Sequence, residues 1–135
     1  MLTINNLTKD RVDKKLFTKV AKIVFKGENV RTGEVLSVIF VTEAKIQKLN
    51  KKYRKKNKPT DVLSFASDEG LGEIVICLKQ VKKNSIEFKS NFKKESSFIL
   101  IHGILHLLGY DHEGTKKEAE KMQNREAYYL SKLSF

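Results

Sequence analysis

The stretch from Phe98 to Glu113, FILIHGILHLLGYDHE, constrains most strongly what this chain can fold into. It contains all 3 histidines of the sequence. His102 and His106 are four residues apart in an apolar run, so a helix would carry both imidazoles on one face. Gly109 follows the run and predicts the left-handed turn that commonly ends a helix. His112 comes after this turn, and we expect the reversed chain to bring it towards the other two histidines.

His102, His106 and His112 are therefore predicted to form an open metal site. Three imidazole ligands leave the fourth position of a tetrahedral zinc ion free, which is the arrangement of catalytic zinc centres. The alternative is a buried core helix whose histidines are satisfied by backbone groups or water. The clustering of every histidine at helix-and-turn metal spacing favours the metal site. We expect one zinc ion per chain.

The residue after His102 argues against peptidase chemistry. The histidine spacing is similar to that of metzincin proteases, His-Glu-x-x-His-x-x-Gly-x-x-His, but Gly103 stands where those enzymes carry their general-base glutamate. Zinc lowers the pKa of a bound water, which could compensate for the missing base. Two explanations of Gly103 stay open: space for a bulky phosphodiester beside the metal, or close packing of the helix.

The motif HGILHLLGYDH resembles the signature of the YbeY family of bacterial single-domain zinc endoribonucleases. Two further segments resemble the same family and occur in the same order: LNKKYRKKNKPTDVLSF, from Leu49 to Phe65, and LGEIVIC, from Leu71 to Cys77. Ala66 departs from the family pattern, which usually has a proline after Ser-Phe. The resemblance implies a single-strand-specific, metal-dependent endoribonuclease that acts in ribosomal RNA maturation, at the 3′ end of 16S ribosomal RNA, and in ribosome quality control.

The partners that the resemblance implies are ribosomal RNA and the ribosomal subunit or its proteins. Two other functions stay open on the residues alone. One is a non-catalytic ribosome-assembly factor with a structural zinc ion, and the other is a zinc hydrolase of peptides or small molecules. The identity of the general base and of the attacking group, water or the RNA 2′-hydroxyl, also stays open. We expect a monomer.

Positive charge is concentrated in the first part of the chain. The formal net charge is +11; residues 1–60 carry 16 Lys and Arg against 5 Asp and Glu, whereas residues 61–135 carry 11 of each kind. A polyanion such as RNA is the natural partner, because each neutralised phosphate releases counterions. The alternative is a general lysine richness of the surface, against which the uneven distribution argues.

Five further residues are candidates for substrate chemistry. Arg54, in the YR pair of the first family-like segment, is predicted to stabilise phosphate charge, because guanidinium binds phosphate bidentately. The alternative is one more solvated charge on a basic helix. Asp111 is expected to orient a histidine or accept a proton, or else to cap the turn. Lys55 and Lys58 are predicted to contact the RNA backbone, and Ser64 to face the cleft.

The beginning of the chain and its cysteine content favour a cytoplasmic protein. Residues 1–10 contain no apolar run, and the long apolar segment near the histidines is shorter than a membrane span. We therefore expect no membrane partner. Cys77, the only cysteine, cannot form an internal disulfide and is expected in a core strand.

The apolar patterns predict an α+β fold in a single domain, residues 1–135, with about four short strands in one sheet and the metal site at the end of a central helix. Strands are predicted near Leu2 and Ile4 and over 34–42, 61–65 and 73–78, the second of them central and covered on both faces. Helices are predicted over 11–26, from the Thr42 cap to Asn57, within 79–91, from 92–95 to Gly109, and from the Thr115 cap onward. Ile46, Leu49 and Tyr53 are expected to form the buried stripe of the second helix.

Overall fold

The computed structural model describes residues 1–135 and contains one 4-stranded sheet of order β1-β2-β4-β3. The strands β1 (Leu2–Asn6), β2 (Leu36–Phe40) and β4 (Gly70–Ile76) run parallel to one another. The strand β3 (Val62–Ser67) lies antiparallel to β4 at the edge of the sheet. This arrangement confirms the predicted α+β class with four strands in one sheet.

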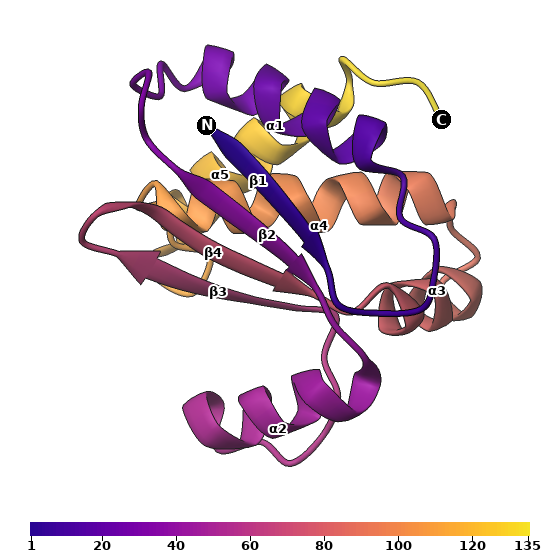
Figure 1. Ribbon diagram of the computed structural model, residues 1–135. Coiled ribbons are helices and arrows are strands. Elements are labelled where there is room, and N and C mark those ends of the chain that lie inside the picture. The colour runs from indigo at the N-terminus through magenta and orange to yellow at the C-terminus, as the bar shows by residue number, and fades with distance from the viewer.

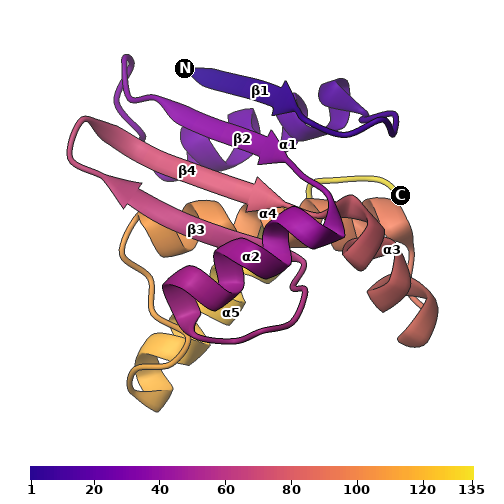
Figure 2. The same ribbon diagram turned by 60° about the horizontal axis from the view of Figure 1, so that its bottom comes forward.

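The helices lie on the two faces of this sheet in unequal numbers. They are α1 (Lys14–Gly27), α2 (Glu43–Arg54), α3 (Leu78–Glu87), α4 (Phe92–Leu107) and α5 (Lys116–Leu130). In Figure 1, α1 and α4 lie on one face of the sheet, and α2 lies on the other. Figure 2, in which α2 comes forward, shows that this single helix crosses the second face on its own. No helix of the chain is both long and apolar enough to span a membrane.

The helix α4 runs through the centre of the core, as its sequence predicts. Most of its apolar residues are buried, with Leu100, Ile101, Ile104 and Leu105 at 0% exposure. The helix begins at a cap in which the Asn91 side chain accepts a hydrogen bond from the Lys94 amide, 3.1 Å away. An apolar helix that contacts the sheet, α1, α3 and α5 gives its two histidines a rigid support.

The end of α4 confirms the turn that Gly109 predicts. Gly109 has a φ of 102°, in the left-handed region where a side chain would be strained. The Tyr110 amide bonds to the Leu105 carbonyl, and the Gly109 amide bonds to the His106 carbonyl, both at 3.1 Å. These two bonds form a Schellman motif, which reverses the chain immediately after the helix.

The strand β2 is central in the sheet, but its two faces are not equally covered. Leu36, Val38 and Phe40 are at 0% exposure on the face that meets α1 and α4. Ser37 and Ile39, which point to the opposite face, are only half-buried. The prediction of complete coverage on both faces is wrong in this respect, because α2 covers only part of that face.

The helix α2 is shorter than predicted, and its last turn is exposed. It ends at Arg54, because Lys55 adopts a left-handed conformation with a φ of 58° and bonds through its amide to the Lys51 carbonyl. Tyr53 was expected in the buried stripe but is 56% exposed. The last turn of α2 lies next to the edge strand β3, where Phe65 is the aromatic side chain in contact with the Tyr53 ring.

The other elements are present as predicted, but β4 (Gly70–Ile76) ends before Cys77 and Leu78, which were expected in this strand; Cys77 is instead the N-cap of α3, and Leu78 is the first residue of that helix. The strands β3 and β4 form an antiparallel hairpin with an irregularity between Ala66 and Ser67, so β3 continues past the position of the family proline. The helix α5 begins at Thr115, whose hydroxyl accepts a hydrogen bond from the Glu118 amide at 3.1 Å. Cys77 is buried between β4 and α3, and burial raises the pKa of its thiol, as suits a core residue.

Candidate active site

The three histidines lie together at one cleft, as their spacing predicts. The ring centres of His102 and His112 are 4.9 Å apart, and those of His106 and His112 are 6.0 Å apart. The cleft has a volume of about 540 Å³ and is also lined by Arg54 and Ser64. The end of α2, the edge strand β3, the helix α4 and the turn after it therefore bring five predicted site residues to one place.

His102 is held by a carboxylate that the sequence patterns did not identify as a site residue. Its Nδ1 lies 2.7 Å from Oε2 of Glu126, a residue of α5 that is only 6% exposed. Since an ionised carboxylate only accepts hydrogen bonds, Nδ1 carries the proton and donates it to Glu126. This pairing directs Nε2, with its lone pair, away from α5 and makes it available as a ligand.

The signal that could have revealed Glu126 is its place on an apolar stripe. Met122, Glu126 and Tyr129 recur at helical spacing, and all three are buried. A buried carboxylate requires a partner, because an unpaired buried charge is costly. The stripe thus indicated that Glu126 has a partner, but no local pattern indicates that this partner is His102, 24 residues away.

Gly103 allows α4 to pack closely on the sheet. A Cβ atom at this position would lie 2.9 Å from Cδ1 of Ile74 and 3.2 Å from Oγ of Ser64. Of the two explanations left open by the sequence, the structure supports close packing. Any larger side chain at this position would have to displace the side chains of Ile74 and Ser64. The close packing also holds Ser64 beside the histidine helix.

Arg54 reaches the cleft from the last position of α2. Its guanidinium is exposed and forms no ion pair with any carboxylate of the chain. The loop after it is tied back to α2, because the buried Asn50 side chain donates a hydrogen bond to the Lys58 carbonyl at 2.9 Å. A fixed helix end with a free guanidinium can bind an anion at the cleft.

Two carboxylates of the cleft were not predicted from the sequence. Asp61, at the start of the hairpin, and Glu113, after the last histidine, both line it. His112 Nε2 lies 3.6 Å from Oε1 of Glu113, in a contact between two exposed groups. Asp61 belongs to the family-like segment that ends at Phe65. Its place in that segment was the only feature of the sequence that could have indicated a role in the site. Either carboxylate is placed to accept a proton near the histidines.

Lys55 and Lys58 do not line this cleft. Both side chains are exposed on the loop that follows α2. Lys55 directly follows Arg54, and Lys58 lies further along the same loop. Their contact with an RNA backbone stays a prediction.

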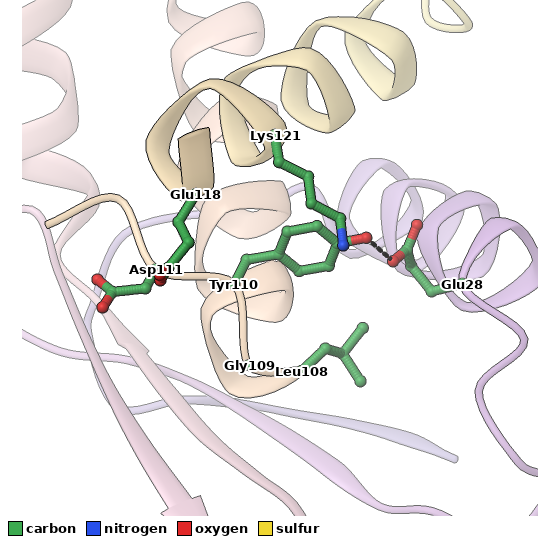
Figure 3. Close-up of a pocket in the computed structure, with 7 residues that line it drawn as sticks. All are labelled: Glu28, Leu108, Gly109, Tyr110, Asp111, Glu118 and Lys121. Carbon is green, nitrogen blue, oxygen red and sulfur yellow. Dashed lines mark hydrogen bonds between the residues drawn. The ribbon is translucent and has the colours of Figure 1, made fainter. Parts of the chain in front are cut away.

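Asp111 does not line the histidine cleft. Its Oδ1 accepts a hydrogen bond from the Glu113 amide at 2.9 Å, which is a cap for the turn. It lines a separate pocket of about 510 Å³, shown in Figure 3, where its carboxylate points away from Tyr110. The carboxylate that contacts His102 is Glu126, and a catalytic role of Asp111 stays a prediction.

A network of four paired side chains closes the back of the same turn. Glu28, after α1, bonds to the hydroxyls of Tyr110 and Tyr129 and forms an ion pair with Arg125 at 2.7 Å. Figure 3 shows Tyr110 reaching across to the Glu28 carboxylate. We call these residues the Glu28 network. It holds Tyr110 in place, which lies between Gly109 and the loop that contains His112.

The contacts within the Glu28 network shift the pKa values of its side chains. Burial alone would raise the pKa of Glu28, but hydrogen bonds from Tyr110, Tyr129 and Arg125 outweigh it, so the pKa lies below its ordinary value. Burial, together with the hydrogen bond to Glu28, raises the pKa of Tyr129 to about 12. The hydrogen bond to Glu28 also raises the pKa of Arg125. The network is therefore charged at Glu28 and Arg125 and neutral at its tyrosines near neutral pH.

The histidine cleft fits a zinc ion in its donor chemistry. As the side chains stand, no three His, Cys, Asp or Glu groups are close enough to hold an ion between them. His106 and His112 are exposed, however, and His102 has its Nδ1 bonded to a buried carboxylate, the arrangement found around zinc-binding imidazoles. Three imidazoles without a fourth protein ligand match a catalytic rather than a structural zinc ion.

A sequence model of the family described as Endoribonuclease YbeY matches residues 3–134. The chain belongs to the YbeY family. Among the relatives of this family member, the endoribonuclease YbeY of Thermodesulfovibrio yellowstonii is 40% identical over 96% of this chain and 94% of its own. The endoribonuclease YbeY of Aquifex aeolicus is also 40% identical, over 95% of this chain and 89% of its own.

The fold of this YbeY family member is similar to one already solved in solution. The structure of TM1509 from Thermotoga maritima matches it with a TM-score of 0.71 and 33% sequence identity. The match covers 97% of this chain and 87% of that protein. The family membership predicted from the histidine motif is therefore confirmed over nearly the whole chain.

Proposed function

We propose that this protein is a zinc-dependent endoribonuclease that cleaves single-stranded RNA in ribosomal RNA maturation, at the 3′ end of 16S ribosomal RNA, and in ribosome quality control. The observation that carries the proposal is the single cleft that joins three histidines to an unpaired arginine. Relatives named endoribonuclease YbeY, which match almost the full chain, support the same reaction.

His102, His106 and His112 would hold the zinc ion. The chemistry that zinc supplies when bound is Lewis acidity, which activates water or a hydroxyl and stabilises phosphate charge. Glu126 accepts the proton of His102 Nδ1 and thereby keeps that ring in the orientation and tautomer needed for binding. Its burial makes this orientation rigid.

Arg54 would bind the phosphodiester from the side of the cleft opposite α4. Its guanidinium donates in a fork that matches two phosphate oxygens, and its contact strengthens as negative charge grows in the transition state. Ser64, held beside α4 by Gly103, would donate a hydrogen bond to the same phosphate. Asp61 or Glu113 would accept the proton of the attacking group, and Asp111 would keep the turn of His112 in place.

The basic surface near the cleft would bind the rest of the RNA strand. Exposed lysines lie on α2 and on the loop that follows Arg54, among them Lys55 and Lys58. Their attraction for phosphate is independent of base sequence and falls with salt. We propose a cytoplasmic monomer that meets its substrate on the ribosomal subunit.

The proposed function is tested by cleavage of a short single-stranded RNA by the zinc-loaded protein. We expect the wild type to cleave the single strand and to leave the duplex of the same sequence intact. We expect His106→Ala to lose about a hundredfold or more in rate, because it loses a ligand of the site. Gln123→Ala, an exposed residue of α5, serves as the matched control and should cleave normally.

Two outcomes would redirect the assignment. No cleavage by the zinc-loaded wild type would favour a non-catalytic assembly factor. Hydrolysis of peptides at rates that rival RNA cleavage would favour a hydrolase of another substrate. Gly103 argues against the second outcome, because it places no side chain where such proteases carry their general-base glutamate.

A further inference from the structure

A second hollow lies on the face of the sheet opposite α4. It is a groove of about 470 Å³ lined by residues of α2 and of the strands β2, β4 and β3. Its walls are mainly apolar, with Ile39, Val75 and Phe65 from the sheet and Leu49 and Tyr53 from α2. Hollows of this size with mainly apolar and aromatic walls and a few polar groups are typical of sites for small organic ligands.

An aromatic pair forms one end of this groove. The ring centres of Tyr53 and Phe65 are 5.1 Å apart, with the rings inclined at 66°. Tyr53 is 56% exposed although it belongs to a helix that packs on the sheet. Aromatic rings gain free energy from burial, so an accessible ring at the wall of an apolar groove is available to stack on a planar ligand.

The groove and the histidine cleft meet at this aromatic pair. Tyr53 and Phe65 line both hollows. Each is next in the chain to a cleft residue, Arg54 after Tyr53 and Ser64 before Phe65. Because β3 is an edge strand, the two hollows adjoin across it without a further strand between them. A ligand whose phosphate lies beside Arg54 therefore has its neighbouring parts within reach of the groove.

The charged side chains around the groove are compatible with a nucleobase inside it and the sugar-phosphate backbone outside it. Lys45 lines the groove, and Lys52 Nζ lies 5.2 Å from the centre of the Tyr53 ring. Glu73, at the wall formed by β4, would repel a phosphate but can accept a hydrogen bond from the amino group of a base. Eight of the 11 lining residues are hydrophobic, and the other three, Lys45, Ser67 and Glu73, provide hydrogen-bonding groups, so the groove suits a nucleobase better than a phosphate.

We propose that this groove binds an unpaired nucleobase of the RNA substrate, stacked on Tyr53 and Phe65, next to the phosphate that Arg54 contacts. The proposal rests on the proposed function, because it takes RNA as the substrate. It also supplies a physical reason for a preference for single strands. A base in a duplex is already stacked and paired, and it can enter the groove only after it has been unpaired.

The test compares three variants in their binding of a short fluorescent RNA, with EDTA present to prevent cleavage. Tyr53→Ala removes the ring, Tyr53→Phe keeps it, and Phe88→Ala removes an aromatic ring that is 69% exposed elsewhere. We expect Tyr53→Ala to weaken single-strand affinity about tenfold, Tyr53→Phe to stay within about twofold, and Phe88→Ala to bind like the wild type. Affinity for the duplex should be the same in all proteins, because backbone contacts alone support it.

Parallel zinc-loaded cleavage reactions separate failure of the base site from failure of the proposed function. If the wild type cleaves RNA but Tyr53→Ala binds the single strand as tightly as the wild type, the base site is overturned. The apolar groove would then be a site for a protein segment. Equal losses for single strand and duplex would also overturn it. A wild type that neither binds nor cleaves RNA would overturn the base site and the proposed function together.

Discussion

The turn between α4 and α5 separates two clusters of polar side chains of opposite character. In the histidine cleft, Arg54, His106 and His112 are exposed, and Arg54 has no ion-pair partner. In the Glu28 network, every polar group that meets the carboxylate is bonded to it or to a neighbour. Adjacent residues of α5 serve both clusters, because Arg125 bonds to Glu28 and Glu126 bonds to His102.

This contrast separates stability from function. Polar groups that are fully paired and partly buried hold elements together, whereas unpaired polar groups at a cleft are available to a ligand. We therefore expect substitutions in the Glu28 network to lower the free energy of unfolding. Substitutions in the cleft should instead lower zinc binding or cleavage and leave that free energy almost unchanged.

The largest loss of stability is expected for Glu28→Ala. The carboxylate is 10% exposed, and its removal leaves Arg125 and two tyrosine hydroxyls without their partner. Because Arg125 is 32% exposed and can regain water, the expected cost is about 2 kcal/mol. Denaturant unfolding measures it, with Glu120→Ala on the exposed face of α5 as a control that should stay within about 0.5 kcal/mol. Equal values for the two variants would contradict a stabilising role of the network.

Arg54→Ala should lose activity and keep its stability. Loss of a donor to the transition state typically costs about 3 kcal/mol, on the order of a hundredfold in rate. Single-turnover cleavage of a short RNA measures this loss, and RNA affinity is measured in parallel. Lys56→Ala, which removes an exposed charge two residues away, should change affinity by about 1 kcal/mol or less. Equal small losses in both variants would make Arg54 an ordinary surface charge.

Glu126→Gln should weaken zinc binding by about tenfold to a hundredfold, the usual effect of removing a carboxylate that orients a ligand. The amide has the same shape as the carboxylate but lacks its charge, so the fold should be kept. Calorimetric zinc titration measures the affinity, and Glu120→Gln, exposed on the same helix, is the matched control. Unchanged affinity in Glu126→Gln would show that His102 does not need this partner.

The Glu28 network should also make stability fall at alkaline pH. The pKa of Tyr129 is raised from 10.0 to about 12 in the folded protein. The unfolded tyrosine loses its proton first, so the stabilisation is complete below pH 10 and is lost as the pH rises towards 12. A fall on the order of 2 kcal/mol is expected in urea unfolding over this range. In Tyr129→Phe this part of the fall should disappear; its persistence would assign it to other groups.

The smallest effect is expected from the lysines around the cleft. Simultaneous Lys48→Glu, Lys52→Glu and Lys55→Glu should flatten the salt dependence of RNA binding, because each phosphate contact contributes about one counterion to the slope. The matched triple variant Lys15→Glu, Lys19→Glu and Lys22→Glu changes α1, on the opposite side of the sheet. It should leave the slope closer to the wild type. A larger effect of the α1 variant would move the RNA path away from α2.

The sequence predicted the elements whose signals are local. The apolar run of α4, the glycine that ends it and the Thr115 cap of α5 are read from neighbouring residues, and all are confirmed. The end of α2 was predicted too late, because Pro59 pointed to a stop at Asn57. The actual stop is a left-handed Lys55, a conformation that no residue type in this loop signals.

For the site, too, the sequence predicted local features but not contacts between residues far apart in the chain. Histidine spacing and family resemblance predicted that five residues share one cleft, and the structure places all five there: His102, His106, His112, Arg54 and Ser64. The pairing of His102 with Glu126 and the bond of Tyr110 to Glu28 join residues 24 and 82 positions apart. Such pairs depend on how helices pack, and periodicity within one helix contains no information on the partner.

Zinc content tests the central claim most directly. Metal analysis of the purified wild type should find about one zinc ion per chain, because three imidazoles provide one open site and Cys77 is buried away from it. The His102→Ala, His106→Ala double variant should contain almost none. Full zinc occupancy in the double variant would contradict the assignment of the histidine cleft as the metal site.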